Sequence, residues 1–287
     1  MTEKIVLLLV LNSLTYAAVL FVMASGLTLA FNLMRVVNLA HGAFYLVGGY
    51  VGLSVLIITG NWGIALIAGG LTMAGVSIVI ERFLLSQVRG NFLAQALLTL
   101  SLAIILADVS LAVWGGDPIS IPSPTFLNSP IYFFGIIYPG FRLFILLIGI
   151  IIGVGLWFLL KKTKLGMAIR ASVDNREIAS ATGVNVDRLS VMVFALSAFL
   201  GGVAGVIGGS FLALAPGEDF KILTLTLVVV IMGGMGSFGG TIIGALIISL
   251  ILSIGRLYVP QFSIFLTFVP MVLVLSIWPH GLFGREK

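Results

Sequence analysis

Long apolar runs are the feature that most constrains this chain. Stretches of about 20 mostly apolar residues recur from end to end, and at ~1.5 Å of rise per residue each can cross a bilayer as a helix. Of the 287 residues, 60% are hydrophobic and only 9% are charged. A water-soluble domain could not hide that much apolar surface. The sequence therefore predicts an all-α, polytopic membrane protein.

Eight candidate transmembrane helices are bounded by charged residues, Pro or Gly. They cover residues 5–33, 38–58, 62–80, 93–113, 141–160, 189–213, 222–255 and 262–278. Their lengths suit helices, in which every backbone polar group is satisfied within the segment, as lipid requires. We expect residues 1–287 to form a single membrane domain in the inner (plasma) membrane. A Pro-rich loop, 114–140, and a polar segment, 161–188, are the longest parts outside the bilayer.

The seventh candidate helix, 222–255, is too long for one straight crossing. The run MGGMGSFGG, Met232 to Gly240, interrupts it, and glycines at that density weaken a helix. We predict two helical pieces joined by an irregular or re-entrant elbow, either a structural kink or part of the transport path, with Gly234 and Gly236 as candidate path residues. Residues 234–239 also fit G-x-G-x-x-G, but they lack the βαβ context of a nucleotide site.

Lys and Arg placement predicts the orientation. If segment 161–188 is cytoplasmic and eight spans alternate, ten Lys and Arg residues lie inside, Arg35 among them, and five lie outside. If 222–255 enters and leaves on the outer side, Arg285 and Lys287 move inside, Arg256 moves outside, and the count becomes eleven to four. Both arrangements place the N-terminus outside, and the side of the C-terminus stays open. This bias also explains the net charge of +5 without nucleic acid as a partner.

Segment 161–188 contains a short helix with recognisable ends. Asp174 can act as its N-cap, with Glu177 three residues on in a box-like arrangement, and Gly183 suits the left-handed position after its end. We therefore predict a helix over 175–182, with Lys164 to Ser172 helical upstream. A helix of about two turns is marginal alone and usually docks against something. The alternative is a solvated loop with incidental helix.

These residues carry a resemblance to a known family. EIASATG, Glu177 to Gly183, resembles the E-A-A-x-x-x-G signature of ABC importer permeases, with Ile178 in place of the first alanine. The surrounding sequence from Gly166 is similar to the permease subunits of branched-chain amino-acid importers. So are VNLAHGAFYLVGGY, VVVIMGGMGSFGGTIIGA and the terminal PHGLFGR, although relatives more often carry Arg-Pro-Gln where this chain has Pro279-His280.

The resemblance implies a function and a set of partners. It identifies the chain as a permease subunit of an ATP-driven importer that moves branched-chain or other hydrophobic amino acids, received from an extracytoplasmic solute-binding protein. A second, homologous permease and cytoplasmic ABC ATPase subunits complete the assembly in the lipid bilayer. It also makes the short helix the coupling helix, with candidate ATPase-facing residues Arg170, Asp174, Arg176, Glu177, Ala179 and Gly183. Related permeases move urea or short amides, so the solute stays open.

The partner ATPase is required by what the sequence lacks. There is no G-x-x-x-x-G-K-[ST] and no Gly-Lys pair, so this chain cannot hold ATP phosphates in the P-loop manner. We expect no cofactor in this subunit, with ATP and Mg bound by the ATPases. Two histidines and no cysteine predict no metal site, and no catalytic constellation is recognisable. A stand-alone channel or secondary carrier is the alternative, but it needs intramembrane titratable groups.

Few polar groups lie within the predicted spans. Asn38 and His41 begin the second span, where they either line the transport path or brace the helix entry. Asp108 is the only acidic residue well inside a span, and it either lines the path or pairs with a cation on a neighbouring helix. Gly201, Gly205 and Gly209 share one helix face, which fits close packing within the chain or at a subunit interface.

Overall fold

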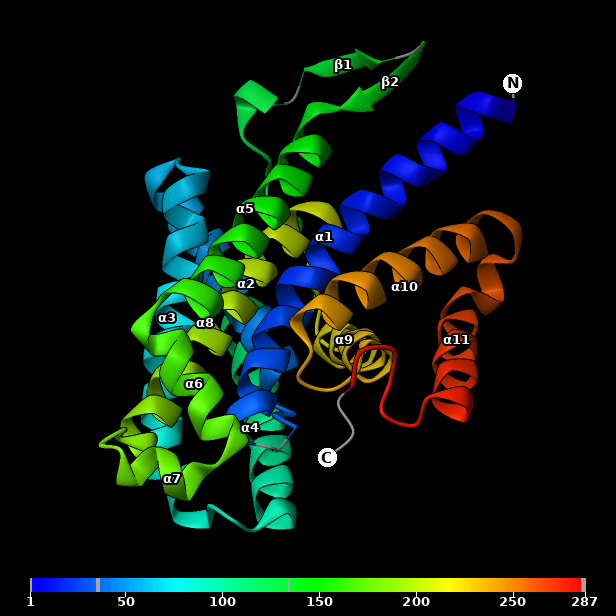
Figure 1. Cartoon of the computed structure of the whole chain (residues 1–287). Coiled ribbons are helices and arrows are strands. Elements are labelled where there is room, and N and C mark those ends of the chain that lie inside the picture. The colour runs from blue at the N-terminus through cyan, green and yellow to red at the C-terminus, as the bar shows by residue number, and fades with distance from the viewer. Residues whose placement is uncertain (1, 35–36, 128, 134, 285–287) are drawn as a thin grey trace.

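The structure, a computed structural model, describes residues 2–34, 37–127, 129–133 and 135–284 and is helical over most of that length (Figure 1). Its α-helices are α1 (Thr2–Met34), α2 (His41–Thr59), α3 (Trp62–Phe83), α4 (Phe92–Trp114), α5 (Gly140–Lys162), α6 (Lys164–Asp174), α7 (Arg176–Ala181), α8 (Val186–Phe211), α9 (Glu218–Gly233), α10 (Phe238–Tyr258) and α11 (Ser263–Ile277). Three short 3-10 helices are η1 (Leu85–Val88), η2 (Thr125–Leu127) and η3 (Pro260–Phe262).

Eight segments of the described chain are long and apolar enough to cross a membrane, which confirms the fold class. They lie in α1, α2, α3, α4, α5, α8, α10 and the segment Pro260–Ile277 formed by η3 and α11. The predicted seventh span is divided as expected, into α9 and α10, with residues 234–237 between them. At 16 residues, α9 is too short to be counted among the eight.

One element was not predicted. The Pro-rich loop contains a two-stranded antiparallel hairpin, β1 (Pro130–Phe133) and β2 (Ile136–Pro139). It lies beside the N-terminus at the top of Figure 1, at the end of the bundle opposite α6 and α7. Earlier in the loop, Ile119 and Leu214 exchange two backbone hydrogen bonds of 2.8 Å, which tie the loop to the turn between α8 and α9. We call this end outer, and the α6–α7 end inner.

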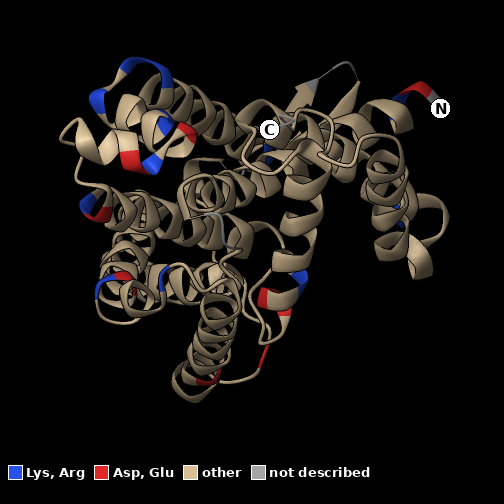
Figure 2. Cartoon of the chain, turned by 60° about the horizontal axis from the view of Figure 1, so that its bottom comes forward, with Lys and Arg blue, Asp and Glu red and all other residues tan. Residues whose placement is uncertain are grey.

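The charged residues separate the two ends. Figure 2 shows Lys, Arg, Asp and Glu gathered in loops and at helix ends, with most helix shafts free of charge. Among the described residues, the inner end carries Arg82, Arg89, Lys161, Lys162, Lys164, Arg170, Arg176 and Arg188, and the outer half carries Lys4, Arg142, Lys221 and Arg256. This eight-to-four ratio follows the positive-inside rule if the inner end is cytoplasmic.

The position of the C-terminal segment distinguishes the two arrangements of 222–255 that the sequence left open. Asn32, near the inner end of α1, donates from Nδ2 to the carbonyl of Gly236 at 2.8 Å. Leu282 and Phe283 donate backbone N–H groups to Met232 and Gly233 at 2.9 and 3.1 Å. The α9–α10 break and the last described residues therefore lie at the inner end, so 222–255 enters and leaves on the outer side. Arg35, Arg285 and Lys287, which entered the count, are outside the described residues.

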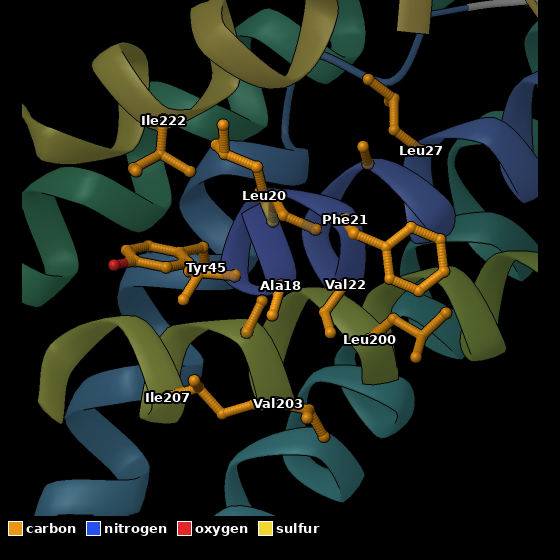
Figure 3. Close-up of a cluster of buried hydrophobic side chains, with 14 of the residues drawn as sticks. Ala18, Leu20, Phe21, Val22, Leu27, Tyr45, Leu200, Val203, Ile207 and Ile222 are labelled. Atoms are coloured by element: carbon orange, nitrogen blue, oxygen red, sulfur yellow. The ribbon is translucent and has the colours of Figure 1, made fainter. Parts of the chain in front are cut away.

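The hydrophobic core forms around α1 and α8. In Figure 3, Leu20 and Val22 of α1 lie among Tyr45 of α2, Leu200 of α8 and Ile222 of α9. α8 is the most buried of the eight spanning segments, whereas α4, α5 and α11 bury little of their surface within the chain. The exposed sides of these three helices are therefore available to lipid or to another subunit.

Three glycines allow α2, α3 and α8 to approach one another closely at one point of the bundle. A Cβ on Gly48 of α2 would lie 2.4 Å from the Cα of Gly202 of α8. A Cβ on Gly202 would lie 2.4 Å from the carbonyl oxygen of Gly69 of α3, and one on Gly69 would lie 2.5 Å from that of Gly48. The contacted atoms are backbone, which cannot move aside as a side chain can. Small residues permit this packing of α2, α3 and α8.

The face of α8 that carries Gly201, Gly205 and Gly209 packs within the chain. A Cβ on Gly205 would lie 2.0 Å from the carbonyl oxygen of Tyr45, and one on Gly209 would lie 2.8 Å from the Ile121 side chain. Of the two readings of this spacing, the structure supports close packing within one subunit.

Replacement of Gly69 by valine tests the three-glycine contact. Because the new side chain would meet the backbone of α2, we expect Gly69→Val to lower the free energy of unfolding by about 1–3 kcal/mol or more. Gly75→Val is the matched control, because Gly75 is an exposed residue of the same helix with nothing within 4 Å of its Cβ position. Thermal unfolding of the two variants in detergent makes the comparison. Equal unfolding temperatures would contradict the packing argument.

Candidate functional site

The polar segment 161–188 folds as α6, α7 and the first residues of α8 at the inner end of the bundle. The predicted upstream helix is α6, which docks through Gly166 and Ile169. A Cβ on Gly166 would lie 2.3 Å from the carbonyl oxygen of Leu160, and Ile169 is buried. On the exposed side of α6, Arg170 donates to that same Leu160 carbonyl, at the end of α5. The segment is therefore fixed to the bundle.

The N-terminus of α7 corrects one prediction. Asn175, not Asp174, is the N-cap, and its Oδ1 accepts hydrogen bonds from the N–H groups of Glu177 and Ile178, each at 3.0 Å. Asp174 instead ends α6. The extended backbone of Asn175, with φ −152° and ψ 111°, places its side chain over the first turn, as an N-cap requires. The cap therefore starts one residue later than predicted, and the box with Glu177 does not form.

Gly183 terminates α7, as predicted, two residues after its last helical residue. Its φ is +90°, in the left-handed region that glycine adopts without strain. The Gly183 N–H donates to the Ser180 carbonyl at 3.0 Å, and the Val184 N–H donates to the Ala179 carbonyl at 3.1 Å. This pair of bonds is a Schellman motif, which satisfies the last carbonyls of the helix. Caps at both ends stabilise a helix that is otherwise too short.

One face of α7 is buried and the other is open. Ala179 is only 2% exposed, whereas Ile178 is 63% exposed. Arg176 and Glu177 are exposed as well. A short capped helix thus presents an isoleucine between charged residues at the inner end of a membrane bundle. In a helix that faced only water, an apolar side chain at this position would have no packing to gain.

A charge network connects α7 to two long helices, and sequence reasoning missed it. Arg89, in the turn after α3, donates to the buried Glu81 of α3 at 2.5 Å and also to Asp187 of α8. Asp187 lies 3.4 Å from Arg176 of α7. Because Glu81 is fully buried, its charge depends on Arg89 for compensation. The spacing of these residues in the sequence gives no sign of their proximity.

The remaining candidate residues with polar side chains lie on α4 and around the start of α2. His41 is fully buried, and its Nε2 lies 2.9 Å from the carbonyl oxygen of Met23 in α1. Asn38 is buried too, and its Oδ1 accepts from the Ala40 N–H at 3.1 Å. These contacts fit the bracing of a helix entry. Asp108 is on the exposed side of α4.

Gly234 and Gly236 serve the break between α9 and α10. Their φ values are +101° and +88°. A Cβ on Gly234 would lie 2.4 Å from the backbone N of Gly284, and one on Gly236 would lie 2.2 Å from Oδ1 of Asn32. The irregular backbone is therefore packed inside protein, one of the two settings in which membrane proteins tolerate it.

Comparison with known proteins identifies the family. The family model described as the permease component of branched-chain amino acid transport systems matches residues 9–275. This chain belongs to that family. Its members are non-catalytic subunits of ABC transporters that bind no cofactor themselves and work with ATPase and binding-protein partners.

Individual relatives span nearly the whole permease. The high-affinity branched-chain amino acid permease LivH of Salmonella typhimurium is 25% identical, over 96% of this chain and 94% of LivH. BraD of Pseudomonas aeruginosa, a permease of the same description, is 23% identical over 96% of this chain and 95% of BraD. The ribose import permease RbsC of Escherichia coli is 27% identical over 83% of this chain and 74% of RbsC. Among solved structures, PsaBC from Streptococcus pneumoniae shares the fold, with a TM-score of 0.50, 16% identity and coverage of 95% and 92%.

Removal of Arg89 tests the charge network. Arg89→Ala leaves Glu81 buried without a counter-charge, and we expect it to lower the free energy of unfolding by about 3–5 kcal/mol. Arg82→Ala, a change at an exposed arginine of the same region, is expected to stay within about 0.5 kcal/mol of the unmodified protein. Unfolding in detergent measures both.

A second substitution separates charge from packing. In Glu81→Gln combined with Arg89→Ala the uncompensated charge is gone, so we expect the double variant to be more stable than Arg89→Ala alone. A double variant that is less stable than either single variant would show that the pair acts through packing and would refute the electrostatic account.

Proposed function

We propose that this permease carries branched-chain or other hydrophobic amino acids across the membrane, received from an extracytoplasmic binding protein. It would pair with a second, homologous permease and bind two cytoplasmic ATPases through segment 161–188. ATP-driven closure of the ATPases would push α7 and switch access to the path from one side to the other. LivH and BraD, which match nearly the full chain, support the amino-acid substrate.

The observation that carries the coupling role is the construction of α7. The helix is capped at both ends, buried through Ala179 and joined by Arg176 to the Asp187–Arg89–Glu81 network. A push on its exposed face would therefore reach α3 and α8 rather than be absorbed by a flexible loop. Arg170, Asp174, Arg176, Glu177, Ala179 and Gly183 remain our candidate residues for this interface.

A carboxylate-free solute is the main alternative, because RbsC is a ribose permease and is also similar to this chain. Uptake by the complete complex in vesicles, with leucine, urea and ribose as competing solutes, distinguishes the substrates. ATP-dependent accumulation of leucine alone is the expected result. Accumulation of ribose or urea without leucine would overturn the substrate assignment and leave the family intact.

The conformation of Gly183 gives a test of coupling. Gly183→Val forces a β-branched residue into the left-handed region, whereas asparagine tolerates that region. No atom lies within 4 Å of the Cβ position, so only backbone conformation separates the two variants. We expect ATP-driven uptake to fall about five- to thirtyfold in Gly183→Val and to stay within about twofold in Gly183→Asn, in line with a strain of ~1–2 kcal/mol. Equal uptake by both, with assembly unchanged, would refute the coupling role.

The exposed side chain of Ile178 gives a test of docking. Ile178→Asp places a charge where we expect an apolar contact with the ATPase, and most of the side chain it replaces is free of contacts within the chain because the residue is 63% exposed. Co-purification of the ATPase with the permease should fall, while the unfolding temperature of the permease alone stays unchanged. Phe126→Asp, at an exposed apolar residue of the outer loop, is the comparison and should leave co-purification unchanged. Full retention of the ATPase by Ile178→Asp would exclude this contact.

A further inference from the structure

A cavity at the outer end is lined by Arg142 and Arg256, two of the four Lys and Arg residues described in the outer half. It has a volume of about 450 Å³ and lies between α1, α5, α8 and α10. Its polar and aromatic lining consists of Asn12, Tyr16, Arg142, Phe211, Ser253 and Arg256, and aliphatic side chains of α1 and α10 complete the wall. Neither the coupling segment nor the α9–α10 break contributes to it.

Both arginines are held in place by neutral groups. Arg142 donates from Nη1 to Oδ1 of Asn12 at 2.6 Å, and its guanidinium carbon lies 5.3 Å from the ring centre of Phe211. The guanidinium carbon of Arg256 lies 4.9 Å from the ring centre of Tyr16. Contacts of this kind orient a guanidinium without removing its charge.

No carboxylate compensates the two charges. Among the ion pairs of the described residues, none includes Arg142 or Arg256. Glu218, at the start of α9, is bonded to Lys221 instead, at 2.8 Å. Arg142 is half-buried and Arg256 is exposed, and together they create a positive potential beside apolar walls that concentrates anions. The positive-inside rule depletes Lys and Arg on this side, so two arginines at one cavity form a distinct positive site there.

We propose that this cavity is the extracytoplasmic subsite that receives the carboxylate of a zwitterionic solute with an aliphatic side chain. The inference rests on the importer function proposed above and deepens it. The guanidinium groups of Arg142 and Arg256 match a carboxylate, to which arginine donates two parallel hydrogen bonds. The aliphatic residues Leu8, Leu9 and Leu257 line the space beside them and would contact the side chain of the solute.

The dimensions and the chemistry of the cavity agree with this ligand. Its volume falls within the roughly 300–1,000 Å³ of small-molecule sites, which combine apolar walls with a few polar groups. The hydroxyl oxygen of Ser253 is an acceptor available to an ammonium group, whereas the Asn12 carbonyl oxygen already accepts from Arg142 and Tyr138. A neutral sugar or urea would leave both cations uncompensated. The cavity therefore favours amino acids over the alternative substrates.

An anionic lipid headgroup offers the two arginines the same charge from another source. Its phosphate could enter from the outer leaflet rather than from the binding protein. If the occupant is an amino acid, free leucine should compete with it for the cavity. If the occupant is a lipid, the lipid composition of the bilayer should decide its occupancy. The experiment therefore varies both.

The test uses photoreactive leucine, which carries a diazirine in its side chain, on the assembled transporter in nanodiscs of zwitterionic phosphatidylcholine. We expect cross-links on peptides that contain Leu8, Leu9 or Leu257, detected by mass spectrometry. Arg142→Gln combined with Arg256→Gln should reduce them at least tenfold. Lys221→Gln, which changes another outer cation away from the lining, should leave them unchanged. Excess leucine should abolish the cross-links, and 3-methylbutylamine, which lacks the carboxylate, should not.

Several results would overturn the proposal. They are cross-links that persist in the double glutamine variant, cross-links absent from these peptides, and cross-links that anionic phosphatidylglycerol removes while leucine does not. If the glutamine variant does not assemble, Arg142→Lys combined with Arg256→Lys preserves the charges and should retain most of the labelling, with the same competition pattern. Leucine uptake by the same preparation separates the two claims. Uptake without cross-links refutes this subsite alone, and ATP-driven uptake of ribose or urea but not leucine refutes the proposed substrate.

Discussion

The contact of Gly48, Gly69 and Gly202 is the constraint on which the rest of the structure depends. It brings the backbones of α2, α3 and α8 together more closely than any larger residue would allow. Lipid supplies no hydrophobic driving force between helices, so close packing of this kind is a main source of their association. The result is a unit of three helices with α8, the most buried spanning segment, at its centre.

This unit reaches the inner end of the bundle, where the charges lie. Glu81 near the end of α3 and Asp187 at the start of α8 are both bound by Arg89, and Asp187 also pairs with Arg176 of α7. Packed elements move as rigid bodies more readily than they deform. The short capped helix is thus joined to the three-helix unit through Arg176 and Asp187. In a transporter whose energy is supplied by another subunit, such a junction is where force would enter.

Local features were the most predictable part of this structure. Apolar runs predicted the spanning helices, the glycines of residues 232–240 predicted the break between α9 and α10, and Gly183 predicted the end of α7. Each depends on residues adjacent in the chain, so each leaves a mark in the sequence. The N-cap at Asn175 was missed by one position because Asp174 and Asn175 are both capping residue types, and only the backbone conformation separates them.

Long-range features were not predictable in the same way. Arg89 and Asp187 are 98 positions apart, and Arg142 and Asn12 are 130 apart, so nothing local pairs them. The hairpin β1–β2 was missed although residues 130–139, PIYFFGIIYP, carry the aromatic and β-branched residues and the central glycine that are typical of one. The path residues proposed from polarity alone, Asn38, His41 and Asp108, stay predictions, because a polar side chain within a span can brace a helix as well as line a cavity.

The central claim is that α7 moves together with the inner ends of α3 and α8. The chain has no cysteine, so spin labels can be placed at chosen positions without background from this subunit. One label pair, at the exposed residues Ser180 and Phe83, measures α7 against α3, and a second, at Ser180 and Tyr258, measures α7 against the outer end of α10, which is not part of the three-helix unit. In the assembled complex, pulsed electron–electron double resonance should show that trapping the ATP-bound state changes the second distance and leaves the first unchanged. A change in the Ser180–Phe83 distance with the Ser180–Tyr258 distance constant would contradict the account.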